Sequence, residues 1–317
     1  MKNIYSNIFK LNKKNLLKSI YYLKSNNLVA LPTETVYGLA GNAYSNKSVK
    51  KIYSLKKRPK INPLIVHYYN MKDVHNDVVI SQKFLKLYKN LCPGPITFIL
   101  KKKKYSKISN LVTANLNTVA IRFPNNVQTR KILKKIKFPL AIPSANKSSG
   151  VSPVDALDVA DEFKKKIKMI INGGRSKIGV ESTVLDLTGK VKILRPGKIS
   201  VMQISKILKE KVFLTKTSKK IKAPGSLKKH YSPGIPIKIN QIKAPSNVAF
   251  ITFGKKYKKS KNIFNLSKKS NLNEAAKNLY KIFNQIKKLK YNQIYITKIP
   301  EKGIGVAIND RIKRAAN

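Results

Sequence analysis

The chain has 317 residues and a formal net charge of +54, because 67 lysines and arginines stand against 13 acidic residues. Its length allows one large domain or two ordinary ones, and a hydrophobic content of 42% supports a real core, so the charge does not indicate disorder. The single cysteine, Cys92, excludes an intrachain disulfide and a cysteine-rich zinc site.

Helical and strand-like patterns alternate over residues 1–210. Apolar residues recur at helical spacing over 16–23, before a strand-like run at 28–31. A second helix around 49–55 must end near Arg58, because Pro59 disfavours a helical residue before it. Further helices are expected at 84–88, 132–136 and 200–209, among apolar runs expected to be strands at 63–67, 96–100, 118–123, 140–143, 169–173, 182–187 and 191–197. This alternation predicts an α/β or α+β domain with a mixed sheet.

The pattern breaks at residues 211–235 and then restarts. This segment has no clear periodicity and contains two Pro-Gly pairs, so we interpret it as a linker. Beyond it, strand-like and helical patterns alternate at 248–254, 275–289, 293–300 and 305–316. The order predicts a small doubly wound, Rossmann-like second domain over 236–317.

Near the start of the chain, residues 31–43 read LPTETVYGLAGNA. The stretch is uncharged except for Glu34, although the chain is saturated with lysine. A strand leading into a polar turn would explain it, since Gly and Thr are common there. A hydroxyl-rich binding patch is the alternative, and other segments favour it.

Motifs of the common nucleotide and metal sites are absent from the sequence. It contains no GxxxxGK[ST] loop, no GxGxxG turn after a strand, no HExxH and no GxSxG. The three histidines, His67, His75 and His230, are too scattered to suggest a metal site. If the protein handles nucleotides, it does so through basic side chains, hydroxyls and backbone amides.

Such groups cluster at the ends of predicted elements. Arg58, Arg122 and Arg195 each lie at an end of a predicted strand or helix. The planar arginine fork suits phosphate or carboxylate, which makes these three better candidates than any lysine run, although an exposed basic helix end would also explain Arg58. Residues 142–153, IPSANKSSGVSP, form either an ordinary loop or a turn that presents hydroxyls and amide N–H groups to an anion.

Taken in order, these segments resemble the threonylcarbamoyl-AMP synthase family, which has the YrdC-like fold. The resemblance rests on PTETVYGL (32–39), Lys56-x-Arg58 with NPL (62–64), PGPIT (93–97), TVAIRFP (118–124), PSANKSSG (143–150), ESTVLD (181–186) and RPG (195–197), and it covers nearly the whole chain. Residues 230–236 and 303–316 resemble the longer, two-domain members. Cys92 and Ile142 depart from the family pattern, the first where a larger residue and the second where a small one is usual.

The resemblance implies a nucleotidyltransferase, an L-threonylcarbamoyladenylate synthase. Such an enzyme makes threonylcarbamoyl-adenylate and pyrophosphate from L-threonine, bicarbonate or CO2, and ATP. Mg²⁺ would enter with ATP, without direct protein ligands. The product would serve N6-threonylcarbamoyladenosine modification of tRNA by the downstream tRNA-threonylcarbamoyl transferase machinery.

The resemblance also assigns residues to roles. The catalytic Lys-x-Arg and Ser-x-Asn set corresponds to Lys56, Arg58, Ser144 and Asn146. Threonine would be held by Thr33, Thr35, His67, Arg122, Ile142 and Ser182. ATP would be held by Lys56, Arg58, Asn62, Thr118, Ser144, Ser152 and Arg195. A lid over the site would be formed by His230, Tyr231 and Ser232 of the linker.

Two other functions compete with this one. A non-catalytic RNA-binding protein of this fold would explain the charge, yet the lysine excess also fits the codon bias of an AT-rich genome. A carbamoyltransferase of the hydrogenase-maturation type shares the fold but needs cysteine-rich zinc fingers, which one cysteine cannot supply. No run approaches the roughly 20 apolar residues of a membrane span, so we expect a cytoplasmic protein without membrane contact.

Overall fold

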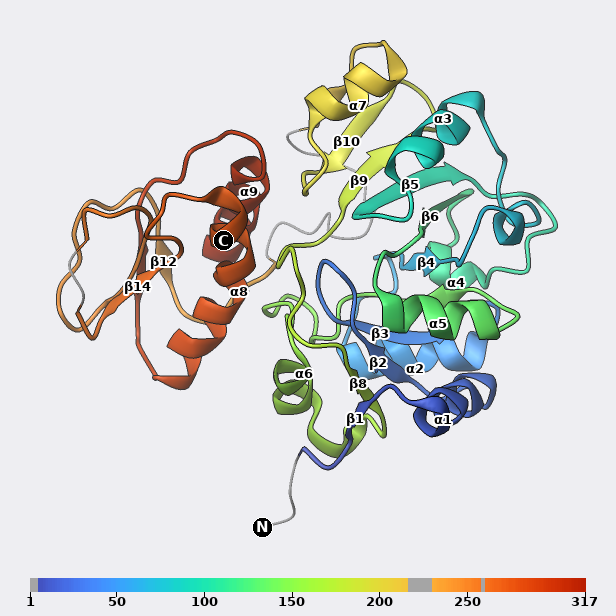
Figure 1. Cartoon of the computed structure of the whole chain (residues 1–317), viewed down its shortest axis with the longest axis horizontal. Helices are drawn as coiled ribbons and strands as arrows, with labels where there is room; N and C mark the ends of the chain where they lie inside the picture. Colours follow the sequence, from blue (N-terminus) through green and yellow to red (C-terminus); the bar gives the residue numbers. More distant parts are fainter. Residues whose placement is uncertain (1–4, 216–229, 258–259) are drawn as a thin grey trace.

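The computed structural model describes residues 5–215, 230–257 and 260–317, and it divides into a larger and a smaller α/β body (Figure 1). Residues 216–229, most of the predicted linker, lie outside the described residues. The smaller body packs against one side of the larger one, with helices α8 and α9 facing it (Figure 1). No described helix is both long and apolar enough to cross a membrane, and the cytoplasmic location stays a prediction.

The larger body is built on an eleven-stranded mixed sheet with the order β1-β8-β2-β3-β7-β4-β6-β5-β9-β10-β11. The sheet contains parallel pairs, such as β4 with β6, and antiparallel pairs, such as β5 with β6, which confirms the predicted mixed sheet. The strands are β1 Ile8–Lys10, β2 Val29–Leu31, β3 Gly38–Asn42, β4 Ile65–His67, β5 Ile96–Lys101, β6 Thr118–Arg122, β7 Leu140–Ala141, β8 Ile170–Asn172, β9 Thr183–Asp186, β10 Lys192–Arg195 and β11 Phe213–Leu214.

The helices of this body begin where the sequence supplies side-chain caps. Those helices are α1 Lys13–Lys24, α2 Asn46–Lys56, α3 Gln82–Leu91, α4 Asn110–Thr113, α5 Val127–Lys135, α6 Ala156–Phe163 and α7 Val201–Leu208, with 3-10 turns η1 Lys72–Val74 and η2 Lys164–Lys166. In α2, the Ser45 side chain accepts a hydrogen bond from the Ser48 amide. The helix ends with Lys57 in the left-handed region at φ 48°, ahead of Pro59, as the sequence predicts. This stop fixes the backbone just before Arg58.

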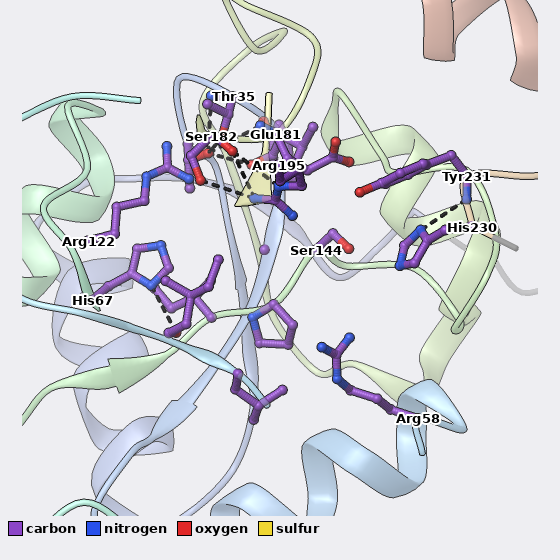
Figure 2. Close-up of a pocket in the computed structure, with 18 residues that line it drawn as sticks. Thr35, Arg58, His67, Arg122, Ser144, Glu181, Ser182, Arg195, His230 and Tyr231 are labelled. Atoms are coloured by element: carbon purple, nitrogen blue, oxygen red, sulfur yellow. Dashed lines mark hydrogen bonds between the residues drawn. The ribbon is translucent and has the colours of Figure 1, made fainter. Parts of the chain in front are cut away.

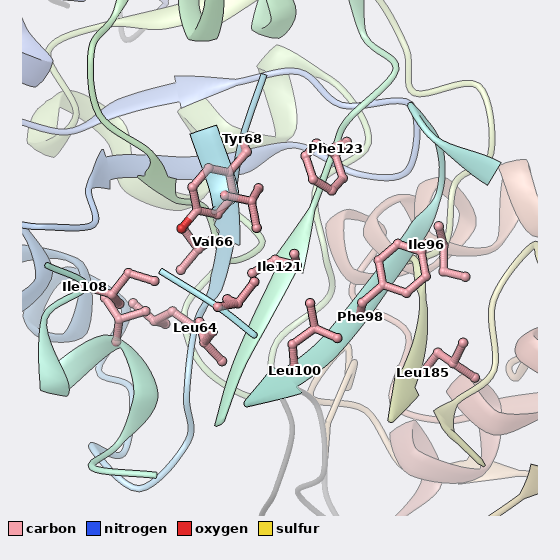
Figure 3. Packing of buried hydrophobic residues seen from close by; sticks show 14 of the residues in the cluster. Leu64, Val66, Tyr68, Ile96, Phe98, Leu100, Ile108, Ile121, Phe123 and Leu185 are labelled. Atoms are coloured by element: carbon pink, nitrogen blue, oxygen red, sulfur yellow. The ribbon is translucent and has the colours of Figure 1, made fainter. Parts of the chain in front are cut away.

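An aromatic and aliphatic cluster covers one face of β4, β5 and β6 (Figure 3). Phe84 and Phe98 meet edge to face with ring centroids 5.1 Å apart. Val66 and Ile121 also point into this cluster. Because side chains alternate along a strand, the next residues, His67 and Arg122, point to the opposite face. The cluster therefore holds rigidly the strands that carry two predicted threonine-binding residues.

The smaller body holds a four-stranded, fully parallel sheet with the order β12-β15-β13-β14. Its strands are β12 Ile237–Lys238, β13 Ala249–Thr252, β14 Ile263–Asn265 and β15 Ile294–Ile296, and its helices are α8 Leu272–Lys288 and α9 Gly305–Ala316. The predicted alternation of strands and helices is present, and the sequence patterns at 248–254, 275–289, 293–300 and 305–316 correspond to β13, α8, β15 and α9. Both helices face the larger body, so the doubly wound arrangement stays a prediction.

The two bodies share buried side chains. Val36, Val154 and Val180 of the larger body pack in the same apolar cluster as α8 and α9. Gly179 has φ +85°, and a Cβ there would lie 2.5 Å from the Cα of Lys277, so α8 can pack this closely only against glycine. The smaller body is therefore joined to the larger one by a packed interface.

Candidate active site

A pocket lies between the strand ends of the large sheet and the segment that re-enters at residue 230 (Figure 2). It is lined by Thr33, Thr35, Val36, Tyr37, Gly38, Arg58, Leu64, Ile65, His67, Arg122, Ile142, Pro143, Ser144, Glu181, Ser182, Arg195, His230 and Tyr231. Segments far apart in the sequence thus converge on one cavity, and most of the predicted site residues are among them.

The hydroxyl-rich stretch forms the turn between β2 and β3. The Thr33 hydroxyl donates to the Val36 carbonyl at 2.6 Å and accepts from the amides of Thr35 and Val36 at 3.2 Å each. Its oxygen also lies 2.8 Å from that of Thr35. Thr33 therefore shapes the turn, while the buried Thr35 hydroxyl is presented to the pocket. The stretch is thus a polar turn that also lines a pocket, and its role as a binding patch stays a prediction.

Arg122 faces the pocket from the end of β6 with a carboxylate behind it. Its Nη2 lies 2.7 Å from Oε1 of Glu34, and the two side chains are only 5% and 9% exposed. The Glu34 carboxylate also accepts from the Asn125 amide at 3.1 Å. Nε of Arg122 is buried without a partner among the described residues. An arginine held from behind, with an unused donor, suits a bound anion.

His67 lies beside Arg122, because β4 and β6 pair in parallel with these residues opposite each other. Burial, together with the charge of Arg122, holds the pKa of His67 well below its usual range, so the ring is neutral. Its Nδ1 is 3.2 Å from the Ile65 carbonyl, which can only accept. The proton is therefore assigned to Nδ1, and Nε2 remains as an acceptor.

Arg58 is anchored by the loop that follows α2. Its Nε donates to the Asn62 carbonyl at 2.9 Å, and its Nη2 donates to the Asn62 side chain at 2.6 Å and to the Pro63 carbonyl at 2.7 Å. Burial lowers the pKa of Arg58 to about 10, which still leaves it charged at neutral pH. Asn62 therefore orients Arg58 and does not itself line the pocket.

Lys56 and Asn146 shape the loop that carries Ser144. The ammonium group of the fully buried Lys56 donates to the carbonyls of Ser144 and Asn146. The Asn146 amide in turn donates to the carbonyls of Lys147 and Gly150 at 2.7 and 2.9 Å. Of the predicted catalytic set, Arg58 and Ser144 line the pocket, whereas Lys56 and Asn146 lie behind it.

Ser182 and Arg195 form a rigid pair on a third side. Arg195 donates to the Ser182 carbonyl through Nε at 3.1 Å and Nη2 at 3.0 Å, and to its hydroxyl at 3.2 Å. The Ser182 hydroxyl also lies 2.8 Å from that of Thr97. At Gly197, a Cβ would be 2.3 Å from the Thr183 amide nitrogen, so the segment after Arg195 can approach this closely only with glycine.

His230 and Tyr231 face the pocket from the side of α9 (Figure 2). The His230 amide donates to the Arg314 carbonyl at 3.1 Å, and the Ser232 amide donates to the Ser149 carbonyl at 2.8 Å. Burial, with nearby cations, lowers the pKa of His230 to about 3, despite the opposing charge of Glu181. The Tyr231 hydroxyl is buried with no partner among the described residues. It is thus a polar group left for a ligand.

Several predicted residues do not line this pocket, and their ligand contacts stay predictions. Thr118 lies at the far end of β6 from Arg122. Ser152 is fully buried and donates to Glu181 at 2.6 Å. Ser232 lies beyond the lining pair His230 and Tyr231.

Sequence reasoning missed the two buried carboxylates, Glu34 and Glu181, and the lining residue Tyr37. The signal was present, since both glutamates lie in near-neutral segments of a chain with only 13 acidic residues. An acidic residue kept there, among so many lysines, indicates a specific partner. Their partners, Arg122 and Arg311, are 88 and 130 residues away, which no local pattern encodes.

Two family models together cover most of the chain. One described as "Telomere recombination" matches residues 21–197, and one described as "Threonylcarbamoyl-AMP synthase, C-terminal domain" matches residues 199–317. The chain belongs to the two-domain threonylcarbamoyl-AMP synthase family. This confirms the resemblance carried by the motifs and places the chain among enzymes of the nucleotidyltransferase type.

Individual members of the threonylcarbamoyl-AMP synthase family match over nearly their whole length. A protein of that name from Pyrococcus abyssi is 33% identical, with 93% of this chain and 92% of the relative covered. One from Bacillus subtilis is 34% identical, with 96% and 94% covered. A crystal structure of the P. abyssi protein complexed with L-threonine matches with a TM-score of 0.87, 30% identity and 98% and 96% coverage. The predicted α/β fold is thereby confirmed.

Proposed function

We propose that this chain makes threonylcarbamoyl-adenylate and pyrophosphate from L-threonine, bicarbonate or CO2, and ATP. One observation carries the proposal: a single pocket brings together Thr35, His67 and Arg122 with Arg58 and Arg195. The first group suits a small hydroxy amino acid, and the second suits phosphates. The family membership and the threonine-bound relative support the same conclusion.

Threonine would bind against β4 and β6. Its carboxylate would meet Arg122, whose Nε is unpaired among the described residues and whose charge Glu34 holds in place. Nε2 of the neutral His67 would accept a hydrogen bond from the threonine hydroxyl or amine. Thr35 and Ser182 supply further hydroxyls, and Ile142 supplies apolar contact for the methyl group. Both charge and shape would then select a hydroxy amino acid.

ATP would bind against Arg58, Ser144 and Arg195. The guanidinium groups of Arg58 and Arg195 are already oriented by carbonyls and hydroxyls, so they lose little conformational entropy when they bind phosphates. Among the described residues no group of three His, Cys, Asp or Glu side chains could hold a metal ion. Mg²⁺ enters the proposal with the ATP substrate, as the family resemblance implies.

The reaction needs positioning more than a side-chain nucleophile. The threonine amine and bicarbonate form a carbamate with release of water, and a carbamate oxygen then attacks the α-phosphorus of ATP while pyrophosphate leaves. The arginines offset the negative charge that accumulates on the phosphates. The pocket walls, including His230 and Tyr231, limit hydrolysis of the carbamate and adenylate. Opening and closing of this segment as a lid stays a prediction.

The adenylate would be passed to the transferase machinery that modifies tRNA, and we place this transfer in the cytoplasm. The charge of +54 is the observation that favours the second candidate, a non-catalytic RNA-binding protein. A binding protein has no need of a pocket with two buried carboxylate–arginine pairs, and for this reason we prefer the enzyme.

Product detection tests the proposal. Purified full-length protein is incubated with ATP, Mg²⁺, ¹³C-bicarbonate and L-threonine, and the products are analysed by mass spectrometry. We expect threonylcarbamoyl-adenylate carrying the heavy carbon, and much less product with L-serine. RNA binding without any adenylate from a folded sample would favour the second candidate instead.

A further inference from the structure

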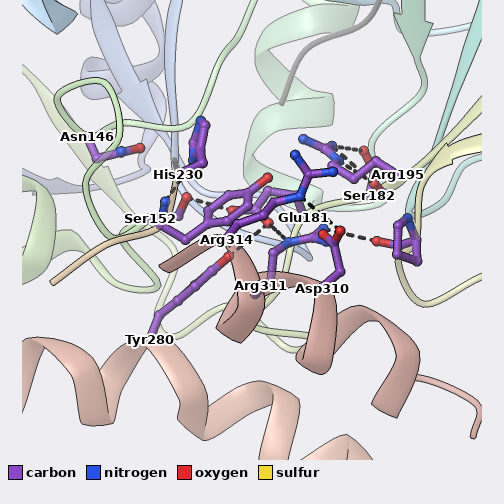
Figure 4. A network of polar contacts seen from close by, with 12 residues as sticks. Asn146, Ser152, Glu181, Ser182, Arg195, His230, Tyr280, Asp310, Arg311 and Arg314 are labelled. Carbon is purple, nitrogen blue, oxygen red and sulfur yellow. Dashed lines mark hydrogen bonds and ion pairs between the residues drawn. The ribbon is translucent and has the colours of Figure 1, made fainter. Parts of the chain in front are cut away.

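The network between Glu181 and the smaller body takes no part in the steps of the proposed reaction (Figure 4). Arg311 of α9 is 0% exposed, and its Nε lies 2.7 Å from Oε2 of Glu181. Glu181 lines the pocket, whereas Arg311 lies behind it. A side chain of the smaller body thus reaches a wall of the site.

Glu181 is a fixed, ionised carboxylate. It accepts hydrogen bonds from the Ser152 hydroxyl at 2.6 Å and from the Tyr280 hydroxyl at 3.1 and 3.0 Å. Burial alone would raise its pKa, but Arg311 and Arg195 lower it to about 2. A full negative charge therefore lies in the wall of a pocket that we propose for a triphosphate. Left uncompensated, it would repel that ligand.

Arg195 is the cation that an uncompensated Glu181 would attract. The two lie near enough for the charge of Arg195 to lower the pKa of Glu181, yet the ion pairs within the described ranges join Glu181 to Arg311 and not to Arg195. Among the described residues, the Arg195 guanidinium bonds only to neutral oxygens of Ser182, so its charge is still available to a ligand.

Arg311 also touches the other groups around Arg195. Its Nη2 donates to the carbonyl of Pro196, the residue after Arg195, at 3.0 Å. Its guanidinium carbon lies 5.0 Å from the ring centroid of Tyr231, which stacks on Tyr280 at 5.9 Å. One buried side chain thus fixes the carboxylate, the backbone and the aromatic ring on this side of the pocket.

We propose that Arg311 is a positioning residue of the nucleotide site: it neutralises Glu181 and so leaves Arg195 for the phosphates of ATP. This inference rests on the proposed function and deepens it, because it gives the smaller body a share in ATP binding. The competing explanation is a simple clamp between the bodies, in which Asp310 also pairs with Arg311 at 2.6 Å and with Arg314 at 2.9 Å.

The two explanations differ in how the effects of substitutions combine. If Arg311 only clamps, R311Q and E181Q both remove the same contact, and the double variant is no better than R311Q. If Arg311 neutralises Glu181, R311Q lets Glu181 compete with phosphate for Arg195, and removing the Glu181 charge restores the site. Rescue of R311Q by E181Q is therefore specific to the electrostatic role.

The test is calorimetric titration of full-length protein with Mg²⁺ and α,β-methylene-ATP, which cannot release pyrophosphate. We expect R311Q to raise the Kd about tenfold or more and R311Q/E181Q to return it to within about threefold of the unsubstituted protein. R314Q is the matched control, since it removes a charge one turn further along α9 that pairs with Asp310. It should change the Kd by less than about twofold. Thermal unfolding of each variant reports its folding.

Unchanged affinity of folded R311Q, or a double variant no tighter than R311Q, would overturn the proposal. If R311Q does not fold, the E181Q variant alone decides. We expect E181Q to bind the ATP analogue about twofold more tightly, because the charge of Arg311 is then added to the site. About tenfold weaker binding would show that Glu181 itself holds the ligand and would overturn the proposal. If the unsubstituted protein binds no ATP analogue, the proposed function fails. Inorganic pyrophosphate, titrated into the same variants, then tests the neutralisation of Glu181 separately.

Discussion

Two buried carboxylate–arginine pairs lie at this pocket. In one pair the arginine lines the pocket, and in the other the carboxylate does. In the first, Arg122 lines the pocket and Glu34 lies behind it, and both residues belong to the large sheet and its loops. In the second, Glu181 lines the pocket and Arg311 lies behind it, and the pair joins the two bodies. The distance between nitrogen and oxygen is 2.7 Å in each pair, but the charge presented to a ligand differs.

The difference shows how one pocket can hold two kinds of anion. The first pair presents a cation that is held steady by its carboxylate, which suits the carboxylate of an amino acid. The second pair presents a compensated carboxylate, so the positive charge on that side comes from Arg195 and Arg58. A buried ion pair contributes little net stability, because desolvation offsets the attraction, so a role in ligand binding is the better explanation for both.

The strongest challenge to the first pair is Arg122→Gln. It removes the proposed partner of the threonine carboxylate and leaves Glu34 buried and uncompensated. We expect threonine affinity to fall about a hundredfold and the free energy of unfolding to drop by about 3–5 kcal/mol. Calorimetry and urea unfolding measure both effects. Arg130→Gln is the control, at a half-buried arginine that bonds to the carbonyls of Tyr69 and Pro124, and equal losses in both variants would contradict the assignment.

At the proposed phosphate site, Arg58→Ala should weaken ATP binding about tenfold to a hundredfold. This is the loss of affinity expected when one charge-assisted hydrogen bond is removed. Threonine affinity should change little, since Arg58 contacts residues 62 and 63 and not the Arg122 pair. Equilibrium binding of both ligands separates the two effects. Lys60→Ala, an exposed lysine two residues away, controls for net charge. Unchanged ATP affinity in Arg58→Ala would remove this arginine from the site.

Each half of the pocket also buries one neutral histidine, and substitution of His230 separates its contribution to the pH dependence of stability from that of His67. The pKa of His230 is about 3 in the folded protein against an ordinary value of 6.5, so between these values only the unfolded chain binds the proton. Stability should therefore fall as pH drops from 6.5 towards 3, by up to about 1.4 kcal/mol per pH unit from this group.

Comparison of urea unfolding at pH 7 and pH 5 checks this, because Glu181, with a pKa of about 2, stays ionised in the folded protein over that range. In His230→Gln the loss between the two pH values should be smaller than in the unsubstituted protein. An identical loss would mean that His230 is already protonated in the fold. His67 contributes in the same direction and remains in both proteins.

The smallest effects on ligand affinity are expected when the negative charge of each carboxylate is removed in turn. Glu34→Gln loosens Arg122 and should weaken threonine binding about threefold to tenfold, with ATP binding nearly unchanged. Glu181→Gln should leave threonine binding nearly unchanged and tighten ATP binding about twofold. The two variants thus shift different ligands in opposite directions. If both weaken the same ligand, the two pairs do not serve separate ligands.

Much of the fold could be predicted, because its helices and longer strands carry clear periodicity. The secondary-structure elements that were not predicted were missed for physical reasons. Strands β1, β11, β12 and β14 were missed and have only two or three residues each, although equally short strands such as β2 and β4 were predicted. Strand β3, with the sequence GLAGN, has weak intrinsic preference and forms because β2 and β7 pair with it on both sides. Helix α6 was recoverable, since Asp155 caps it and its buried residues follow helical spacing.

The site was predictable where chemistry and motif coincide, as at Arg58, His67, Arg122, Ser182 and Arg195, all of which line the pocket. Residues that act through others were not separable from the sequence. Lys56 and Asn62 belong to the same motifs, and only the structure shows that they bind loop carbonyls and Arg58. Arg311 lies far from every motif of the larger body, so only packing of the two bodies reveals its contact with Glu181.

Pyrophosphate release by the purified full-length protein tests the central claim most directly. The assay contains ATP and Mg²⁺ and compares L-threonine plus bicarbonate with each one omitted and with L-serine in place of L-threonine. We predict release only when threonine and bicarbonate are both present, because one pocket must hold the carbamate and ATP together. Pyrophosphate release that does not depend on threonine, or no release from a folded sample, would contradict the claim that one pocket binds both ligands.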